Sequence, residues 1–148
     1  MRIALASDHA GFPLKQELAA WLREQGHDVA DLGAHSADSV DYPEFGAKLA
    51  RAVGGHEADR GIAVCGSGIG ISIAVNRDPR CRCARVDDPL SAALAREHND
   101  ANVLALGARL VGPDMAKACV LAFLGTAFAG GRHQRRVDQL STLLEESD

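Results

Sequence analysis

The sequence predicts a single α/β domain built on a parallel sheet of five strands with helices on both faces. Five short apolar runs bounded by Gly, Asp or Asn predict the strands, and helical patterns alternate with them. Repeated strand–helix units bury a parallel sheet on both faces. The length of 148 residues is common for one domain, and 47% hydrophobic residues are enough for its core.

The strands are expected at residues 3–6, 29–32, 61–65, 83–86 and 103–106. A first helix is expected between the first two strands, because four apolar side chains recur on one helical face: Leu14, Leu18, Trp21 and Leu22. Pro13 suits the first turn of this helix, and Gly26 suits its C-terminal cap.

The next helices follow the same rules of periodicity and capping. The second is expected to end at the glycines 54 and 55, and the third to follow a glycine-rich turn. The fourth is expected from residue 89 to about 98, through Leu90 and Leu94. The most apolar stretch, residues 116–129, predicts a buried fifth helix.

Charge and chain composition exclude several classes of partner. The formal net charge is -4, without the basic excess of a nucleic-acid binder, so we expect no nucleic-acid partner. The chain reaches Asp8 too early for a signal peptide, and the stretch 116–129 is shorter than the roughly 20 residues that span a bilayer. We therefore expect a cytoplasmic protein with no membrane partner.

The four cysteines predict neither disulfides nor a metal site. They stand at positions 65, 81, 83 and 119, form no CxxC pair, and have no His at zinc-finger spacing. We expect reduced thiols, no bound metal, and a structural role for the last three.

The strongest local feature is the turn that follows the third strand. Cys65 ends that strand, and a glycine-rich turn leads into a helix: Gly66-Ser67-Gly68-Ile69-Gly70. Glycines let the backbone approach a ligand closely, and free N–H groups at a helix start attract anions and favour a thiolate. This predicts a thiolate beside an anion-binding turn. The alternative is that Cys65 is a small buried hydrophobic residue.

Asp8 and His9 follow the first strand, so in a parallel sheet they are expected at the same edge as Cys65. They can bind hydroxyl groups and phosphate. The alternative is that Asp8 only caps the first helix and that His9 is a solvated loop residue.

His98 and Asn99 form a polar cluster at the end of the fourth helix, directly before the fifth strand. A histidine transfers protons near neutral pH, so His98 is a candidate general acid or base. The alternative is a helix end at which His98 interacts with the dipole and Asn99 enters a turn.

A last helix is expected at about residues 132–144 and is basic at its start. Arg132 and Arg136 lie four residues apart on one helical face, where two guanidinium groups can clamp a phosphate. Arg109, after the fifth strand, is expected to join them. The alternative is a solvated charged face.

Five motifs occur together and in order: Asp8-His9-Ala10-Gly11, Asp41-Tyr42-Pro43, Cys65-Gly66-Ser67-Gly68-Ile69-Gly70, His98-Asn99-Asp100 and Gly130-Gly131-Arg132-His133-Gln134-x-Arg136. On these motifs the chain, from residue 1 to about 140, resembles the ribose-5-phosphate isomerase B family, which includes galactose-6-phosphate isomerase subunits. The resemblance implies a Rossmann-like three-layer αβα sandwich over residues 1–148, with no metal or organic cofactor. It also implies a homodimer or a dimer of dimers, with active sites shared between subunits and the last helix packed on the partner.

The resemblance also implies a role for each matching position. Cys65 is implied to be the base that acts at C2, and His98 the acid or base that opens the sugar ring. The implied substrate-binding residues are Asp8, His9, Tyr42, Gly66, Ser67, Gly68, Ile69, Gly70, Asn99, Arg109, Arg132 and Arg136. Some relatives have glycine in place of Cys65 and an acidic residue just beyond the turn. Ile71 stands at that later position here, so the chain resembles the cysteine type.

The function implied by the resemblance is an aldose–ketose isomerase that interconverts ribose 5-phosphate and ribulose 5-phosphate through a cis-enediolate. Two alternatives remain open. One is an isomerase of a six-carbon sugar phosphate, such as allose or galactose 6-phosphate. The other is a non-catalytic phosphosugar- or nucleotide-binding module, against which the presence of both Cys65 and His98 argues.

Overall fold

The computed structural model describes residues 1–143 and 145, and these residues build one parallel sheet. Its strands are β1 (Arg2–Ser7), β2 (Asp28–Asp31), β3 (Arg60–Cys65), β4 (Cys83–Arg85) and β5 (Val103–Gly107). Their order across the sheet is β2-β1-β3-β5-β4, and every neighbouring pair is parallel. The predicted five-stranded parallel sheet is confirmed.

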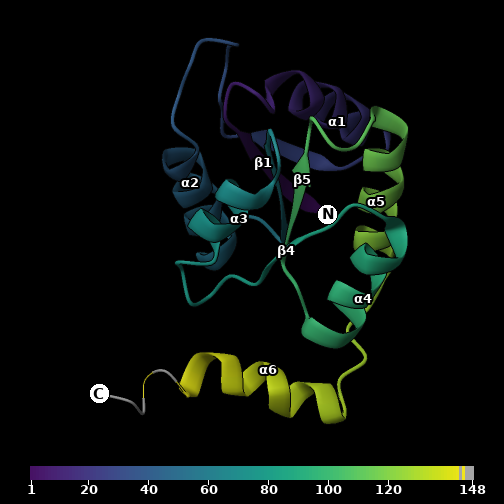
Figure 1. The fold of residues 1–148 in the computed structure, drawn as a ribbon. Coiled ribbons are helices and arrows are strands. Elements are labelled where there is room, and N and C mark those ends of the chain that lie inside the picture. Colours follow the sequence, from purple (N-terminus) through teal and green to yellow (C-terminus); the bar gives the residue numbers. More distant parts are fainter. Residues whose placement is uncertain (144, 146–148) are drawn as a thin grey trace.

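In the described part of the chain, six helices accompany the sheet: α1 (Phe12–Glu24), α2 (Tyr42–Gly54), α3 (Ile69–Val75), α4 (Pro89–Asn99), α5 (Pro113–Gly125) and α6 (Arg132–Thr142). A proline lies in the first turn of α1, α2, α4 and α5, where its missing N–H costs no helical hydrogen bond. Helices α1, α4 and α5 cover one face of the sheet, and α2 and α3 cover the other (Figure 1). The three-layer αβα architecture is confirmed.

The strands alternate their side chains between two apolar cores, as the pleat requires. In β3, Ile62 and Val64 face the core under α1, α4 and α5, whereas Ala63 and Cys65 face the core under α2 and α3. Cys65 therefore ends its strand on the α2–α3 side of the sheet.

Two helices differ from the expectation in detail. The buried face of α4 consists of Ala92, Ala95 and Arg96, while Leu90 and Leu94 are exposed. Helix α5 ends at Gly125, so residues 126–129 are not helical.

Helix α6 stands apart from the sandwich. Residues 126–131 lead away from α5, and α6 then crosses below the body next to the end of α4 (Figure 1). Gly130 and Gly131 have φ values of 64° and 55°, which break the chain direction before the helix begins. The expected helix end at residue 144 lies outside the described residues. Within the described part of the chain, no helix has the length and apolar character needed to span a bilayer.

Candidate functional site

A cleft of about 410 Å³ opens where β1, β3 and β5 end and α2 begins. Parallel strands end at the same edge of a sheet, so the loops after them meet there. The cleft is lined by Asp8, His9, Ala10, Tyr42, Cys65, Gly66, Ser67, Gly70, Arg109 and Leu110. The expected meeting of Asp8 and His9 with Cys65 is confirmed.

The Cys65 sulfur accepts a backbone hydrogen bond inside this cleft. The N–H of Gly68 donates to Cys65 Sγ at 3.1 Å. Gly68 has a φ of 75°, and a Cβ at this position would lie 2.8 Å from the carbonyl carbon of Leu106. Only glycine can therefore aim this N–H at the sulfur. A negatively charged sulfur accepts such a bond more strongly than a neutral thiol does.

The turn after Cys65 lies between two side chains that reach it from other elements. The ring of Tyr42, at the start of α2, covers Gly70 so closely that a Cβ there would lie 2.8 Å from Tyr42 Cζ. The guanidinium group of Arg109 lies beside Gly66. A Cβ at Gly66 would lie 3.3 Å from its Cζ atom. An aromatic ring and a positive charge thus flank the turn.

Asp8 and Ser67 each bind one backbone N–H and keep polar capacity for a ligand. Asp8 is buried, and its Oδ1 accepts the N–H of Gly11 at 3.0 Å, so it does cap the turn into α1. Ser67 Oγ accepts the N–H of Ile69 at 3.1 Å, which leaves the hydroxyl proton for another acceptor.

His9 is held by the loop that precedes α2. Its Nδ1 lies 3.2 Å from both the N–H and the carbonyl oxygen of Val40. When Nδ1 accepts the N–H of Val40, the ring proton is on Nε2, which can then donate to an anion. The loop before α2 thus fixes the orientation of this imidazole.

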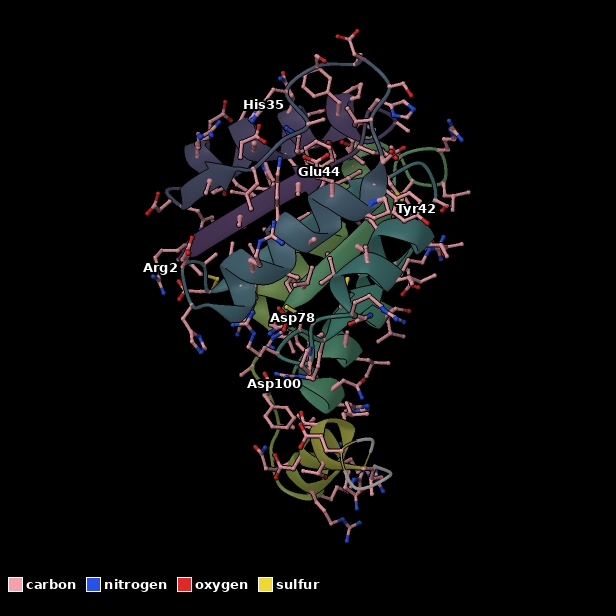
Figure 2. All side chains as sticks on the ribbon, turned by 90° about the vertical axis from the view of Figure 1, so that its left-hand side faces the viewer. Arg2, His35, Tyr42, Glu44, Asp78 and Asp100 are labelled. Atoms are coloured by element: carbon pink, nitrogen blue, oxygen red, sulfur yellow. The ribbon has the colours of Figure 1, made fainter. Side chains whose placement is uncertain are left out.

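The other expected site residues lie at the opposite edge of the sheet. His98 and Asn99 end α4 just before β5, and Arg132 and Arg136 are exposed at the start of α6. Each residue of a strand advances the chain by about 3.3 Å, so the length of β5 alone places about 13 Å between the two edges. Figure 2 shows the same separation: Tyr42 lies high on the body and Asp100 lies low, beside α6.

Within one chain, therefore, the expected site divides into two groups. Arg109 lies with Cys65, so within a single chain it does not lie beside Arg132 and Arg136. A larger cavity of about 650 Å³ lies between α6 and the start of β4, and Asn99 lines it.

The sequence motifs indicate no separate role for His133, yet its ring stacks on that of His98. The ring centroids lie 4.5 Å apart and the planes differ by 12°. Burial and then the positive charges of His98, Arg132 and Arg136 lower the pKa of His133. The signal that could have found it is its place between the arginines of the last motif.

The remaining cysteines lie outside the cleft. Burial raises the pKa of Cys81, Cys83 and Cys119, which is consistent with their expected structural role. Across residues 1–143 and 145, no group of three or more His, Cys, Asp or Glu side chains could hold a metal ion.

Comparison with known proteins identifies the family. A family profile described as Ribose/Galactose Isomerase matches residues 3–140. Ribose-5-phosphate isomerase B of Escherichia coli K12 is 47% identical over 142 residues, which cover 96% of this chain and 95% of that protein. The Clostridium thermocellum ribose-5-phosphate isomerase B structure is 47% identical, with a TM-score of 0.97 over 100% of both chains. The Mycoplasma genitalium enzyme, solved with bound ribulose-5-phosphate, is 38% identical, with a TM-score of 0.92 over 97% of this chain and 96% of that one. This chain therefore belongs to the ribose/galactose isomerase family.

Proposed function

We propose that this protein interconverts ribose 5-phosphate and ribulose 5-phosphate by moving a proton between two adjacent carbons. The relatives named ribose-5-phosphate isomerase B, one of them with bound ribulose-5-phosphate, support this reaction. The observation that carries the proposal is the Cys65 sulfur, which accepts the Gly68 N–H inside a cleft that also contains Asp8, His9 and Arg109. A base beside hydroxyl- and phosphate-binding groups is what this proton transfer requires.

In the proposed reaction, the Cys65 thiolate removes the proton from C2 of the open-chain aldose. The electron pair of that C–H bond forms the C1–C2 double bond of a cis-enediolate, and the negative charge moves to O1. The thiol then returns the proton to C1 while the O2 proton moves to O1, so the ketose forms with no net change in atoms or electrons. Backbone N–H groups of the turn stabilise the enediolate oxygen, by about 3–4 kcal/mol for each well-placed donor.

The proposal includes a dimer in which two chains complete each site. His9 and Arg109 of one subunit would bind the phosphate together with Arg132 and Arg136 of the other, and the His98 that opens the ring would also come from the second subunit. The separation of the two groups within one chain supports this arrangement. Exposed apolar side chains on α3, on α4 and beside Arg109 support it as well: Ile69 (50% exposed), Ile73 (58%), Leu90 (68%) and Leu110 (57%). The packing of α6 on a partner belongs to the same proposal.

The first test is isomerisation of ribose 5-phosphate by the wild type and by Cys65→Ser. Loss of the base is expected to lower kcat by about 10²–10⁴-fold, with a smaller change in KM. Cys83→Ser is the matched control, because Cys83 lies at the other edge of the sheet, and it is expected to keep wild-type kcat. Wild-type kcat in Cys65→Ser would assign the base to another group. An inactive wild type would end the proposal.

Proton transfer is distinguished from a hydride shift in D₂O. The proposed route puts solvent deuterium at C1 of the ketose and is insensitive to chelators, whereas a metal-assisted hydride shift gives the opposite result on both counts. Comparing kcat/KM for five- and six-carbon sugar phosphates then identifies the preferred chain length.

A further inference from the structure

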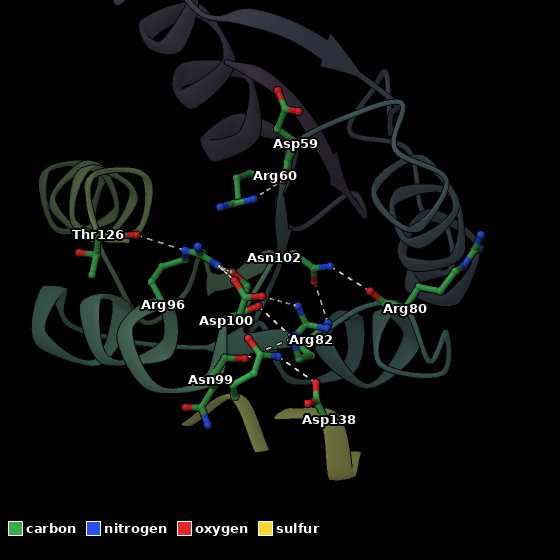
Figure 3. Close-up of polar contacts among 12 residues, drawn as sticks. Asp59, Arg60, Arg80, Arg82, Arg96, Asn99, Asp100, Asn102, Thr126 and Asp138 are labelled. Atoms are coloured by element: carbon green, nitrogen blue, oxygen red, sulfur yellow. Dashed lines mark hydrogen bonds and ion pairs between the residues drawn. The ribbon is translucent and has the colours of Figure 1, made fainter. Parts of the chain in front are cut away.

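Asp100, the residue directly after α4, is held by two arginine side chains. Arg96 Nη1 donates to Asp100 Oδ1 at 2.8 Å, and Arg82 Nη2 donates to Asp100 Oδ2 at 3.1 Å (Figure 3). Asp100 has φ 47° and ψ 43°, a left-handed conformation that non-glycine residues adopt rarely and Asp more readily than most. The chain therefore reverses direction immediately after His98 and Asn99.

Arg82 also binds the carbonyl groups that end α4. Its Nε lies 3.2 Å from the carbonyl oxygen of Asn99 and 2.9 Å from that of Asp100. The last carbonyls of a helix have no helical donor, so this side chain replaces one. Arg82 is fixed in turn, because its backbone N–H donates to Asn102 Oδ1 at 2.7 Å. The end of α4 is thus tied to the segment that enters β4.

Arg96 extends the cluster to the chain that leads into α6. It is only 3% exposed, and it also donates from Nη1 to the Ala101 carbonyl at 2.7 Å and from Nε to the Thr126 carbonyl at 3.3 Å. The backbone N–H of Ala129 donates to the Glu97 carbonyl at 3.0 Å. Two hydrogen bonds therefore link the connection before α6 to α4.

We propose that Asp100, Arg96 and Arg82 are positioning residues that hold the end of α4 and the start of α6 as one rigid unit. That unit presents His98, with His133 stacked on it, to the cleft of a second subunit. Of the three side chains only Arg96 is buried, and taking its charge out of water is costly, so its ion pair is weak evidence for stability and is better explained by the geometry it fixes. The inference rests on the proposed function, because it assigns this geometry to ring opening and phosphate binding.

The two substrates separate the role of this unit from the role of Cys65. Ribose 5-phosphate closes into a furanose through O4 and must be opened, whereas the phosphate on O5 of ribulose 5-phosphate prevents its ring closure. Exchange of the C1 proton of ribulose 5-phosphate with D₂O therefore needs Cys65 but no ring opening. A misplaced His98 should slow conversion of the ribose form and spare this exchange.

Asp100→Asn keeps the size and the left-handed preference of the residue but removes its charge. It is expected to lower kcat for saturating ribose 5-phosphate by about 10–100-fold, as small misplacements of reacting groups do. The exchange rate with saturating ribulose 5-phosphate should change by less than about threefold, since Cys65 is undisturbed. Asp78→Asn is the matched control, because Asp78 pairs with Arg80 at 2.7 Å on the same side of the protein, and it should leave both rates unchanged.

Arg96→Lys tests the same inference with the positive charge retained. One ammonium group cannot replace the guanidinium bonds to Asp100, Ala101 and Thr126 together, so the same selective loss is expected. This variant decides the question if Asp100→Asn does not fold. Equal losses of conversion and exchange, or no loss of either, would overturn the inference.

A second measurement does not depend on activity. Stacked rings shift each other's NMR signals, so the Cε1–H signals of His98 and His133 report the 4.5 Å stack directly. Asp100→Asn or Arg96→Lys should move both signals toward unstacked values, and Asp78→Asn should not. Unchanged ring signals in Asp100→Asn and Arg96→Lys would overturn the inference. A wild type that is inactive on ribose 5-phosphate would end only the proposed function, and the ring signals would still test the inference.

Discussion

The imidazole of His133 lies parallel to that of His98, at a centroid distance of 4.5 Å and an interplanar angle of 12°. Two cationic imidazoles repel each other at this distance, and Arg132 and Arg136 add positive charge nearby. Burial, followed by these charges, lowers the pKa of His133 from its ordinary value of 6.5. The stack is therefore favoured when His133 is neutral.

The first prediction concerns pH. Unfolded His133 takes up its proton near pH 6.5, whereas folded His133 does so only at lower pH. Between these values the unfolded state binds more protons, so the contribution of His133 to stability falls as the pH drops below 6.5. Thermal unfolding of wild type and His133→Asn across this range should show a steeper acid loss in the wild type. Parallel curves would contradict the shift.

Arg136→Gln provides an independent check on the same histidine. Removing this positive charge should raise the pKa of His133 toward its ordinary value, as followed by NMR titration of the ring. An unchanged titration midpoint would mean that Arg136 does not contribute to the shift.

Much of the fold is predictable from the sequence because its signals are local. Each strand is a short apolar run ended by Gly, Asp or Asn, and the observed bounds differ from the expected ones by one residue at most at each end. The buried face of helix α4 is less predictable. Leu90 and Leu94 mark an apolar face in the sequence, yet Ala92, Ala95 and Arg96 are buried. Periodicity finds a helix, but it does not show that the buried Arg96 is compensated by Asp100 and by the carbonyl groups of Ala101 and Thr126.

The candidate site is predictable only in part. The meeting of Asp8, His9 and Cys65 follows from parallel topology, since each follows or ends a strand. His98 precedes a strand, so the same rule places it at the far edge. Arg96 and Asp100 are four residues apart, a spacing at which helical side chains pair, but no sequence spacing indicates the contact of Arg82 with Asp100.

The second prediction concerns the turn. Gly68→Ala places a Cβ 2.8 Å from the Leu106 carbonyl carbon at a φ of 75°. The left-handed conformation and the overpacking together should lower the free energy of unfolding by about 2–5 kcal/mol. Loss of the N–H bond to Cys65 should lower kcat by at least about tenfold. Chemical denaturation and steady-state kinetics measure the two effects.

Gly125→Ala is the control for this substitution. A Cβ at Gly125, the last residue of α5, meets no atom within 4 Å, and alanine favours a helix. This variant should be as stable as the wild type or up to about 1 kcal/mol more stable. If Gly68→Ala behaves like Gly125→Ala, the turn is less constrained than the geometry indicates.

The third prediction concerns thiol reactivity. The thiolate is the nucleophile in alkylation, and burial raises the pKa of Cys81, Cys83 and Cys119. Iodoacetamide near neutral pH should therefore modify Cys65 first, as read by peptide mass spectrometry, and ribose 5-phosphate should slow this modification. Faster labelling of Cys83, the most exposed of the other three, would contradict the prediction.

The fourth prediction tests whether two chains complete each site. In a dimer with shared sites, a Cys65→Ser subunit paired with a His98→Gln subunit contains one site with both substitutions and one with neither. Random pairing of equal amounts makes half of the dimers mixed, so activity should recover to about a quarter of the wild-type value although each variant alone is nearly inactive. Coexpression with two different affinity tags isolates the mixed dimer, which should have half of the wild-type kcat per dimer. A mixed dimer no more active than its parents would show that Cys65 and His98 of different chains do not form one site.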